Sequence, residues 1–74
     1  MPCVNADGTV TESGRAILLG LKEAKTAEAL AGATGLPLFR VRSGLREMAQ
    51  AGLVVDLEGA YRVTERGQAL AERS

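Results

Sequence analysis

The spacing of apolar residues changes at Gly52, and this change most constrains the fold. Pro37 can begin a helix that Gly52 ends, and one side of this helix is apolar through Leu38, Val41, Leu45, Met48 and Ala49. After Gly52, apolar residues alternate with other residues over 53–57 and 60–64, on either side of Glu58-Gly59. Alternation around a tight turn predicts a β-hairpin. The expected fold is therefore α+β, mainly α-helical with one small hairpin.

Threonines predict where three further helices begin. Thr11 can cap a helix over residues 12–24, Thr26 can cap one that runs through Thr34 to Gly35, and Thr64 can cap a short one that ends near Arg73. The inward positions of the first two are Ile17, Leu18, Leu21 and Ala24, followed by Ala27, Leu30 and Ala31.

The segment Val10–Leu18 aligns without gaps on Val63–Ala71, which we interpret as one type of helix start used twice. Residues 1–10 include Pro2 and the run Asn5-Ala6-Asp7-Gly8, which is typical of a turn. We expect a flexible arm over 1–10 and a single domain over 11–74.

Composition excludes several classes of function. The 74 residues include one cysteine, Cys3, and no histidine, which excludes an internal disulfide, a four-cysteine zinc site and histidine-dependent catalysis. The chain lacks a phosphate-binding glycine motif and paired carboxylates at a useful spacing, so we expect no enzyme activity, no cofactor and no metal. Cys3 has no resolving partner and is interpreted as incidental.

The longest apolar run, Ala16–Leu19, is too short to span a membrane, so we expect a cytoplasmic protein.

The charges are balanced overall but unevenly placed. Nine basic and nine acidic residues give zero net charge, which argues against a strong overall attraction to nucleic acid or to a membrane. Between Leu36 and Arg46, however, there are three arginines and no acidic residue, a local charge of +3. This short segment is the one basic feature of the sequence.

The spacing Ala31-x3-Gly35-x5-Val41 is typical of a helix-turn-helix. It puts a small residue where two helices cross, a glycine in the turn, and an aliphatic residue that holds the second helix against the first. The same region contains Leu30-Ala31, Thr34-Gly35-Leu36-Pro37, Leu45-Arg46-Glu47-Met48, Ala51-Gly52-Leu53-Val54 and Tyr61-Arg62-Val63-Thr64-Glu65-Arg66-Gly67.

With these residues, the stretch from Thr26 to Leu70 resembles the winged helix-turn-helix family of bacterial regulators, particularly its MarR-like and ArsR-like branches. The resemblance implies a three-helix core, a wing and a short C-terminal helix, in a cytoplasmic transcriptional regulator that binds sequence-specifically to double-stranded DNA. It departs from the family at Gly44, where an apolar side chain is common. The tip of the hairpin, Glu58-Gly59, is also acidic and short, so deep insertion of a wing into the minor groove is not expected.

The outward face of the helix between Pro37 and Gly52 carries most of the candidate DNA-binding residues, while Arg40 lies on its flank and Arg62 on the second strand of the hairpin. Arginine can contact guanine or phosphate, glutamine adenine, serine phosphate or a base, and an apolar side chain a thymine methyl group. Arg42 and Arg46 are the strongest candidates, and the full set is Phe39, Arg40, Arg42, Ser43, Arg46, Gln50 and Arg62.

Two functions remain open on the sequence, and a third and weaker one is a role of the same fold in plasmid or phage replication or partition. The first is a small DNA-binding regulator that places the helix between Pro37 and Gly52 in the major groove, with a homodimer as one means of raising affinity. The second is a winged-helix module that binds a protein partner and not DNA, which the zero net charge, the acidic hairpin tip and an exposed Phe39 favour.

Overall fold

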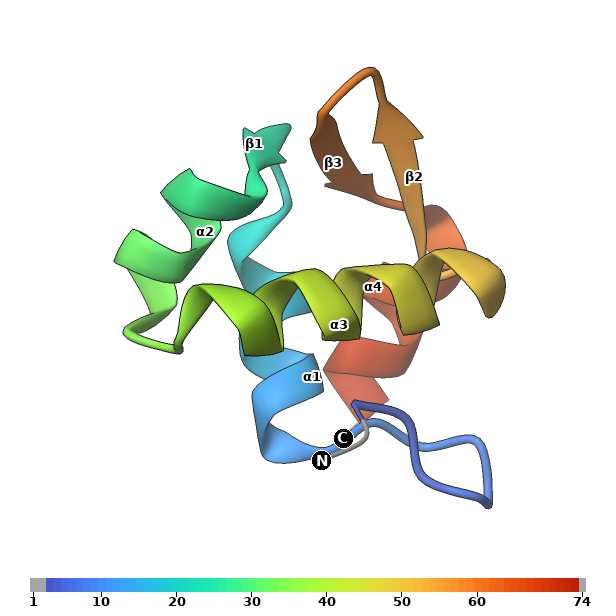
Figure 1. Ribbon diagram of the computed structural model, residues 1–74. Coiled ribbons are helices and arrows are strands. Elements are labelled where there is room, and N and C mark those ends of the chain that lie inside the picture. The colour runs from blue at the N-terminus through green and yellow to red at the C-terminus, as the bar shows by residue number, and fades with distance from the viewer. Residues whose placement is uncertain (1–2, 74) are drawn as a thin grey trace.

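Three of the helices begin directly after threonines that the sequence marks as N-caps. The structure is a computed structural model that describes residues 3–73. It contains α1 (Glu12–Gly20), β1 (Lys25–Thr26), α2 (Ala27–Thr34), α3 (Leu38–Gln50), β2 (Val54–Leu57), β3 (Ala60–Val63) and α4 (Glu65–Arg73), as Figure 1 shows. The side chains of Thr11, Thr26 and Thr64 each accept a hydrogen bond from the backbone N–H three residues later, at 3.0–3.1 Å. The three predicted N-caps are therefore confirmed.

Glycines in the left-handed region end α2 and α3. Gly35 has φ of 76° at the end of α2 and Gly52 has φ of 79° after α3. At the second position the N–H of Leu53 donates to the carbonyl of Met48 at 2.9 Å, and that of Gly52 to the carbonyl of Ala49 at 3.1 Å. This pair of bonds is a Schellman motif, which explains why the helix stops there.

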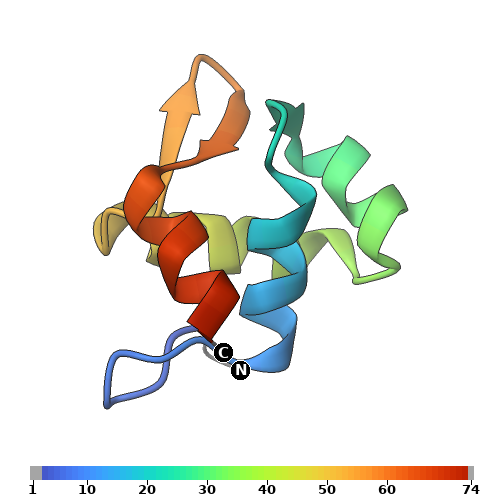
Figure 2. The ribbon, with the colours of Figure 1, turned by 180° about the vertical axis from the view of Figure 1, so that it is seen from behind.

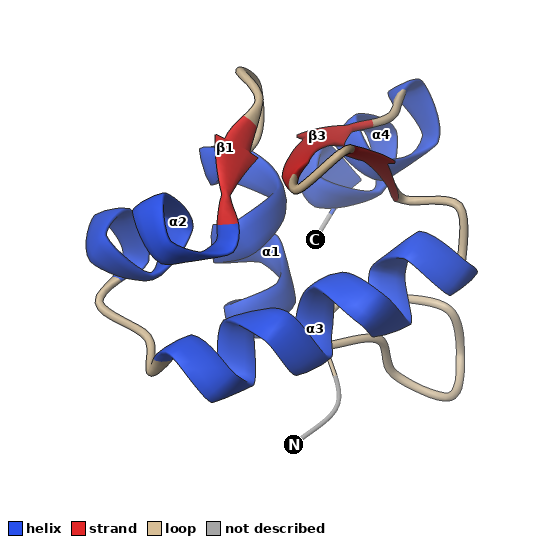
Figure 3. Cartoon of the chain, turned by 45° about the horizontal axis from the view of Figure 1, so that its top comes forward, coloured by secondary structure: helices blue, strands red, loops and turns tan. Residues whose placement is uncertain are grey.

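The predicted hairpin is present, and a third strand that was not predicted joins it. Glu58 and Gly59 have φ of 57° and 101°, as a two-residue turn between β2 and β3 requires. Lys25 and Thr26, which the sequence indicated only as a break between helices, pair with Tyr61 and Ala60 as β1. The result is an antiparallel sheet in the order β1-β3-β2, and Figure 3 shows it above α3.

The core lies between the helices and the inner side of the sheet. Its largest fully buried side chains come from α1, α2 and α3 and from the start of the hairpin, and include Ile17, Leu18, Leu30, Leu45, Met48 and Leu53. Two inward positions predicted from sequence are wrong, because Ala24 lies beyond the end of α1 and Ala49 faces a cavity, and both are exposed. The first helix ends at Gly20 and not at residue 24. Within the described residues, the helices are too short or too polar to cross a membrane.

Residues 3–10 pack against the domain, although the sequence predicted a loose arm over 1–10, of which residues 1 and 2 lie outside the described part of the chain. Cys3 is 1% exposed and Val10 is 7% exposed, and both belong to the core. The backbone N–H groups of Cys3 and Val4 donate to the two carboxylate oxygens of Glu47 on α3, at 2.9 and 3.1 Å. Val4 and Val10 form an antiparallel bridge that closes the segment. Residues 3–10 are thereby fastened to the middle of α3.

Cys3 explains why position 44 of α3 is a glycine. A Cβ on Gly44 would lie 2.5 Å from the Cys3 Sγ and 3.3 Å from the Ile17 Cδ1. The thiol therefore fills the space that a side chain at position 44 would occupy. Burial raises the pKa of the Cys3 thiol, and the nearby charge of Glu47 raises it further, so the buried sulfur stays protonated at neutral pH.

We expect Cys3 and Gly44 to be energetically coupled. Gly44→Ala gains about 1 kcal/mol of helix propensity, but overpacking against the thiol costs about 1–3 kcal/mol. Gly44→Ala should therefore leave the free energy of unfolding of the native chain unchanged or lower it. In a chain that already carries Cys3→Ala, the same substitution should raise the free energy of unfolding. Urea unfolding of the two single variants and the double variant measures this coupling. Equal effects of Gly44→Ala in both backgrounds would contradict it.

The repeated segment of the sequence is a repeated structural unit. The N–H of Thr11 donates to the carbonyl of Cys3 at 2.9 Å, and the N–H of Thr64 donates to the carbonyl of Leu53 at 3.0 Å. Three residues after each threonine, Gly14 and Gly67 pack their α-carbons against the same two carbonyls. Figure 2 shows the two helices that follow, α1 and α4, side by side. The interpretation of the repeat as one type of helix start used twice is confirmed for the threonine caps. The contact between a glycine and a backbone carbonyl is repeated as well.

Candidate nucleic-acid interface

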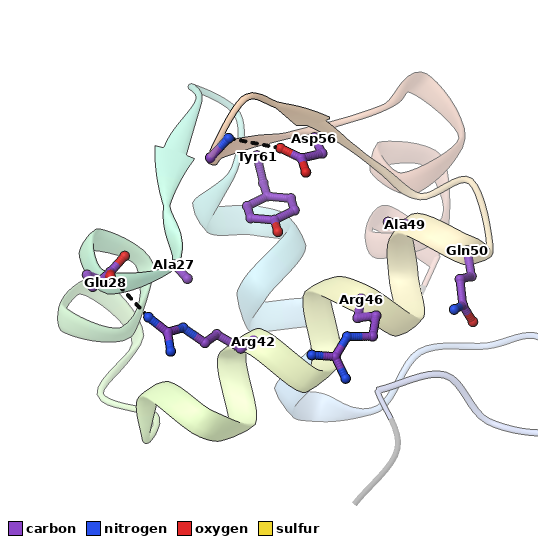
Figure 4. Close-up of a pocket in the computed structure, with 9 residues that line it drawn as sticks. Ala27, Glu28, Arg42, Arg46, Ala49, Gln50, Asp56 and Tyr61 are labelled. Atoms are coloured by element: carbon purple, nitrogen blue, oxygen red, sulfur yellow. Dashed lines mark hydrogen bonds and ion pairs between the residues drawn. The ribbon is translucent and has the colours of Figure 1, made fainter.

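A cavity of about 510 Å³ lies between α3 and the hairpin. Helix α3 supplies Arg42, Arg46, Ala49 and Gln50 to its lining, as Figure 4 shows. The opposite wall comes from Ala27 and Glu28 at the start of α2 and from Asp56, Gly59 and Tyr61 of the hairpin. Three of the candidate DNA-binding residues therefore lie together on one concave surface.

Helical spacing places these side chains. Arg42, Arg46 and Gln50 lie four positions apart along the chain, so they follow one another along a single side of α3. The other side of the helix is anchored by Val41, Leu45 and Met48, which are all 0% exposed. Gly44 lies on that buried side as well, against Cys3. The exposed row of polar side chains is thus held by a well-packed buried row.

The remaining candidates lie outside the cavity lining. Phe39 is 72% exposed near the start of α3, and Ser43 is exposed. Arg40 is half-buried on the flank of α3 nearest residues 3–10, where its charge acts on the Cys3 thiol. Arg62 is exposed on β3, directly after Tyr61, so it points to the other face of the sheet. Arg40 and Arg62 are therefore separated from the row formed by Arg42, Arg46 and Gln50.

The cavity is lined by acidic as well as basic side chains. The Nη2 atom of Arg42 lies 3.2 Å from the Oε2 atom of Glu28, in an ion pair that joins α3 to α2. Asp56 lies on the hairpin wall, where its Oδ1 accepts the N–H of Gly59 at 3.0 Å. Two carboxylates therefore face the two arginines across the concave surface, which lowers the positive potential that a phosphate would meet.

Sequence reasoning missed Glu28 and Asp56 as parts of this surface. Glu28 and Arg42 are 14 residues apart, so no spacing rule within a helix relates them, and their contact depends on how α2 crosses α3. Tyr61 was expected in the core or on a sheet face, and it is half-buried with its ring toward the cavity. The one sequence signal for the position of Tyr61 was the alternation of residues along its strand, which puts every second side chain on the face toward α3.

The described residues offer hydrogen-bond donors and charges at this surface, and among them no three His, Cys, Asp or Glu side chains come together as a metal site. Guanidinium and amide groups on an exposed helix can bind phosphate or the edges of bases. Comparisons with protein-family models, curated proteins and solved structures found no match.

Proposed function

We propose that this chain is a winged helix-turn-helix protein that binds double-stranded DNA with α3 in the major groove. In this proposal α2 and α3 are the two helices of the motif, and the β2–β3 hairpin is a short wing. The protein would act as a transcriptional regulator that binds a specific DNA sequence, and Arg42 and Arg46 would be its main contact residues in the bound complex.

The observation that carries the proposal is the exposed row of Arg42, Arg46 and Gln50 on α3. The row runs along a 13-residue helix whose opposite side is buried. Such a helix is about 20 Å long and 10–12 Å in diameter, and the major groove is about 12 Å wide. The residue types in the row are those used for contacts with guanine, adenine and phosphate.

The hairpin supports a shallow approach to DNA. It carries Glu58 at its tip and Asp56 on the strand just before the tip, and both are exposed. Carboxylates at the tip would be repelled by the phosphates beside a minor groove. The proposed contacts are therefore concentrated on α3, and a small number of phosphate contacts implies weak binding by one copy at physiological salt. Two copies on half-sites about 34 Å apart would raise the affinity.

An NMR titration of labelled protein with a generic duplex tests the proposal without knowledge of a specific site. At roughly 50 mM salt we expect shifts concentrated at Arg42, Ser43, Arg46 and Gln50, and at roughly 200 mM salt we expect them to fade, because backbone contacts release counterions. Amides of α4 should stay unchanged and serve as the internal control. A folded protein whose α3 amides do not move at either salt concentration would overturn the proposal.

A protein partner is the second candidate function. Phe39 is 72% exposed next to Arg40, and an exposed aromatic beside an arginine is a common centre of a protein interface. The acidic hairpin tip also favours a protein over a nucleic acid. If this function holds, Phe39→Ala should abolish partner binding, while the duplex titration leaves α3 unchanged.

A further inference from the structure

The ion pair between Glu28 and Arg42 bears on how tightly the proposed interface would hold generic DNA. Among residues 3–73 it is the one salt bridge, although the chain has 18 charged residues. It engages one of the two arginines that line the cavity. Arg46, four residues along the same row, forms no ion pair within the described part of the chain.

A carboxylate and a phosphate compete for the same donor. Both present oxygen acceptors that a guanidinium group binds with charge-assisted hydrogen bonds. The Glu28 carboxylate already accepts from the Nη2 atom of Arg42 at 3.2 Å. A phosphate that approaches Arg42 must displace this carboxylate or tolerate its negative charge at close range.

The Glu28–Arg42 ion pair is exposed enough to solvent for a phosphate to replace the carboxylate. The side chains of Arg42 and Glu28 are 57% and 65% exposed. Exposed ion pairs contribute little to folding stability, because water screens them and two long side chains lose freedom. The role of the pair is therefore better sought in binding than in the stability of the fold.

We propose that Glu28 limits the affinity of this protein for generic DNA by competing with phosphate for Arg42. This inference rests on the proposed function and adds a residue that sets its selectivity. With Arg42 held by Glu28, a chance encounter with the DNA backbone engages Arg46 alone, and Arg42 is released only where closer docking of α3 compensates for the lost pair.

Glu28→Gln tests the inference, with Glu65→Gln as the matched control. Both substitutions remove a carboxylate from the first turn of a helix that a threonine caps, and both positions are exposed. Binding to a generic duplex is measured by fluorescence anisotropy over a series of salt concentrations. Glu28→Gln should bind about 3- to 10-fold more tightly at low salt, with a salt slope steeper by about 0.9, the contribution of one added phosphate contact. Glu65→Gln should stay within about 2-fold of the native protein.

A second pair of variants tests whether Glu28 acts through Arg42. In a chain that carries Arg42→Gln, Glu28→Gln should change affinity by less than about 2-fold, because the competition has been removed. A persistent increase would overturn the assignment to Arg42, and equal effects of Glu28→Gln and Glu65→Gln would overturn the inference while leaving the proposed function intact. If the native protein does not bind the duplex at any salt concentration, the proposed function falls and the inference falls with it.

Discussion

Reversing the charges of Arg42 and Arg46 together should weaken binding to a generic duplex by about 100-fold or more at low salt. Both side chains are exposed on α3 and line the cavity that faces the hairpin. The double substitution to glutamate changes the charge of this surface by four units, beside Glu28 and Asp56. The phosphate contact of Arg46 would be lost, so the salt slope of any residual binding should fall by about one.

The matched control reverses Arg66 and Arg73 on α4. These two arginines are exposed and line a separate cavity of about 340 Å³ beside residues 3–10. The control has the same net charge as the test variant and should lose far less affinity. Thermal unfolding of both variants verifies that the fold is kept. Equal losses of binding in the two variants would show that overall charge, and not the face of α3, determines the binding.

Gly67→Ala should destabilise the domain by about 2–4 kcal/mol, a large effect for so small a protein. A Cβ at this position would overlap the backbone carbonyl oxygen of Leu53 and lie 2.9 Å from the Cγ2 atom of Val63. The same carbonyl accepts the N–H of Thr64 at 3.0 Å, so moving it away would break the bond that starts α4. A backbone atom cannot rotate aside as a side chain can.

Gly32→Ala is the control for this prediction. Gly32 is in α2, and a Cβ there would meet nothing within 4 Å. The substitution should stabilise the protein by about 0.5–1 kcal/mol, the usual gain of alanine over glycine in a helix. Urea unfolding should therefore shift in opposite directions for the two variants. A stabilising Gly67→Ala would mean that α4 does not pack against Leu53 in this way.

Local signals predicted much of this fold. The threonine caps, the glycines that end α2 and α3 and the Glu58-Gly59 turn act through neighbours within a few residues, so the sequence is enough to find them. The strand formed by Lys25 and Thr26 could not be found in this way. It has two residues, and its partners on β3 are more than 30 positions away, so its pairing depends on the tertiary fold.

Only part of the candidate surface was predicted, because only part of it depends on residues that are close in the sequence. The row of Arg42, Arg46 and Gln50 follows from helical spacing on one element. The wall that faces it comes from α2 and the hairpin, so Glu28 and Asp56 become visible as neighbours only when three elements are brought together. The attachment of Cys3 was likewise hidden, because a short run with turn residues gives no sign that Glu47 binds its backbone.

The packing of the first helix on the last has a consequence for the order of folding. The Nε atom of Arg15 donates to the carbonyl of Ala71 at 3.1 Å, across 56 positions of the chain. Closing so long a loop costs more entropy than joining α2 to α3, which a three-residue turn connects. We therefore expect α2 and α3 to associate early and the α1–α4 contact to form late, so that the rate of folding is set by the meeting of the two ends of the domain.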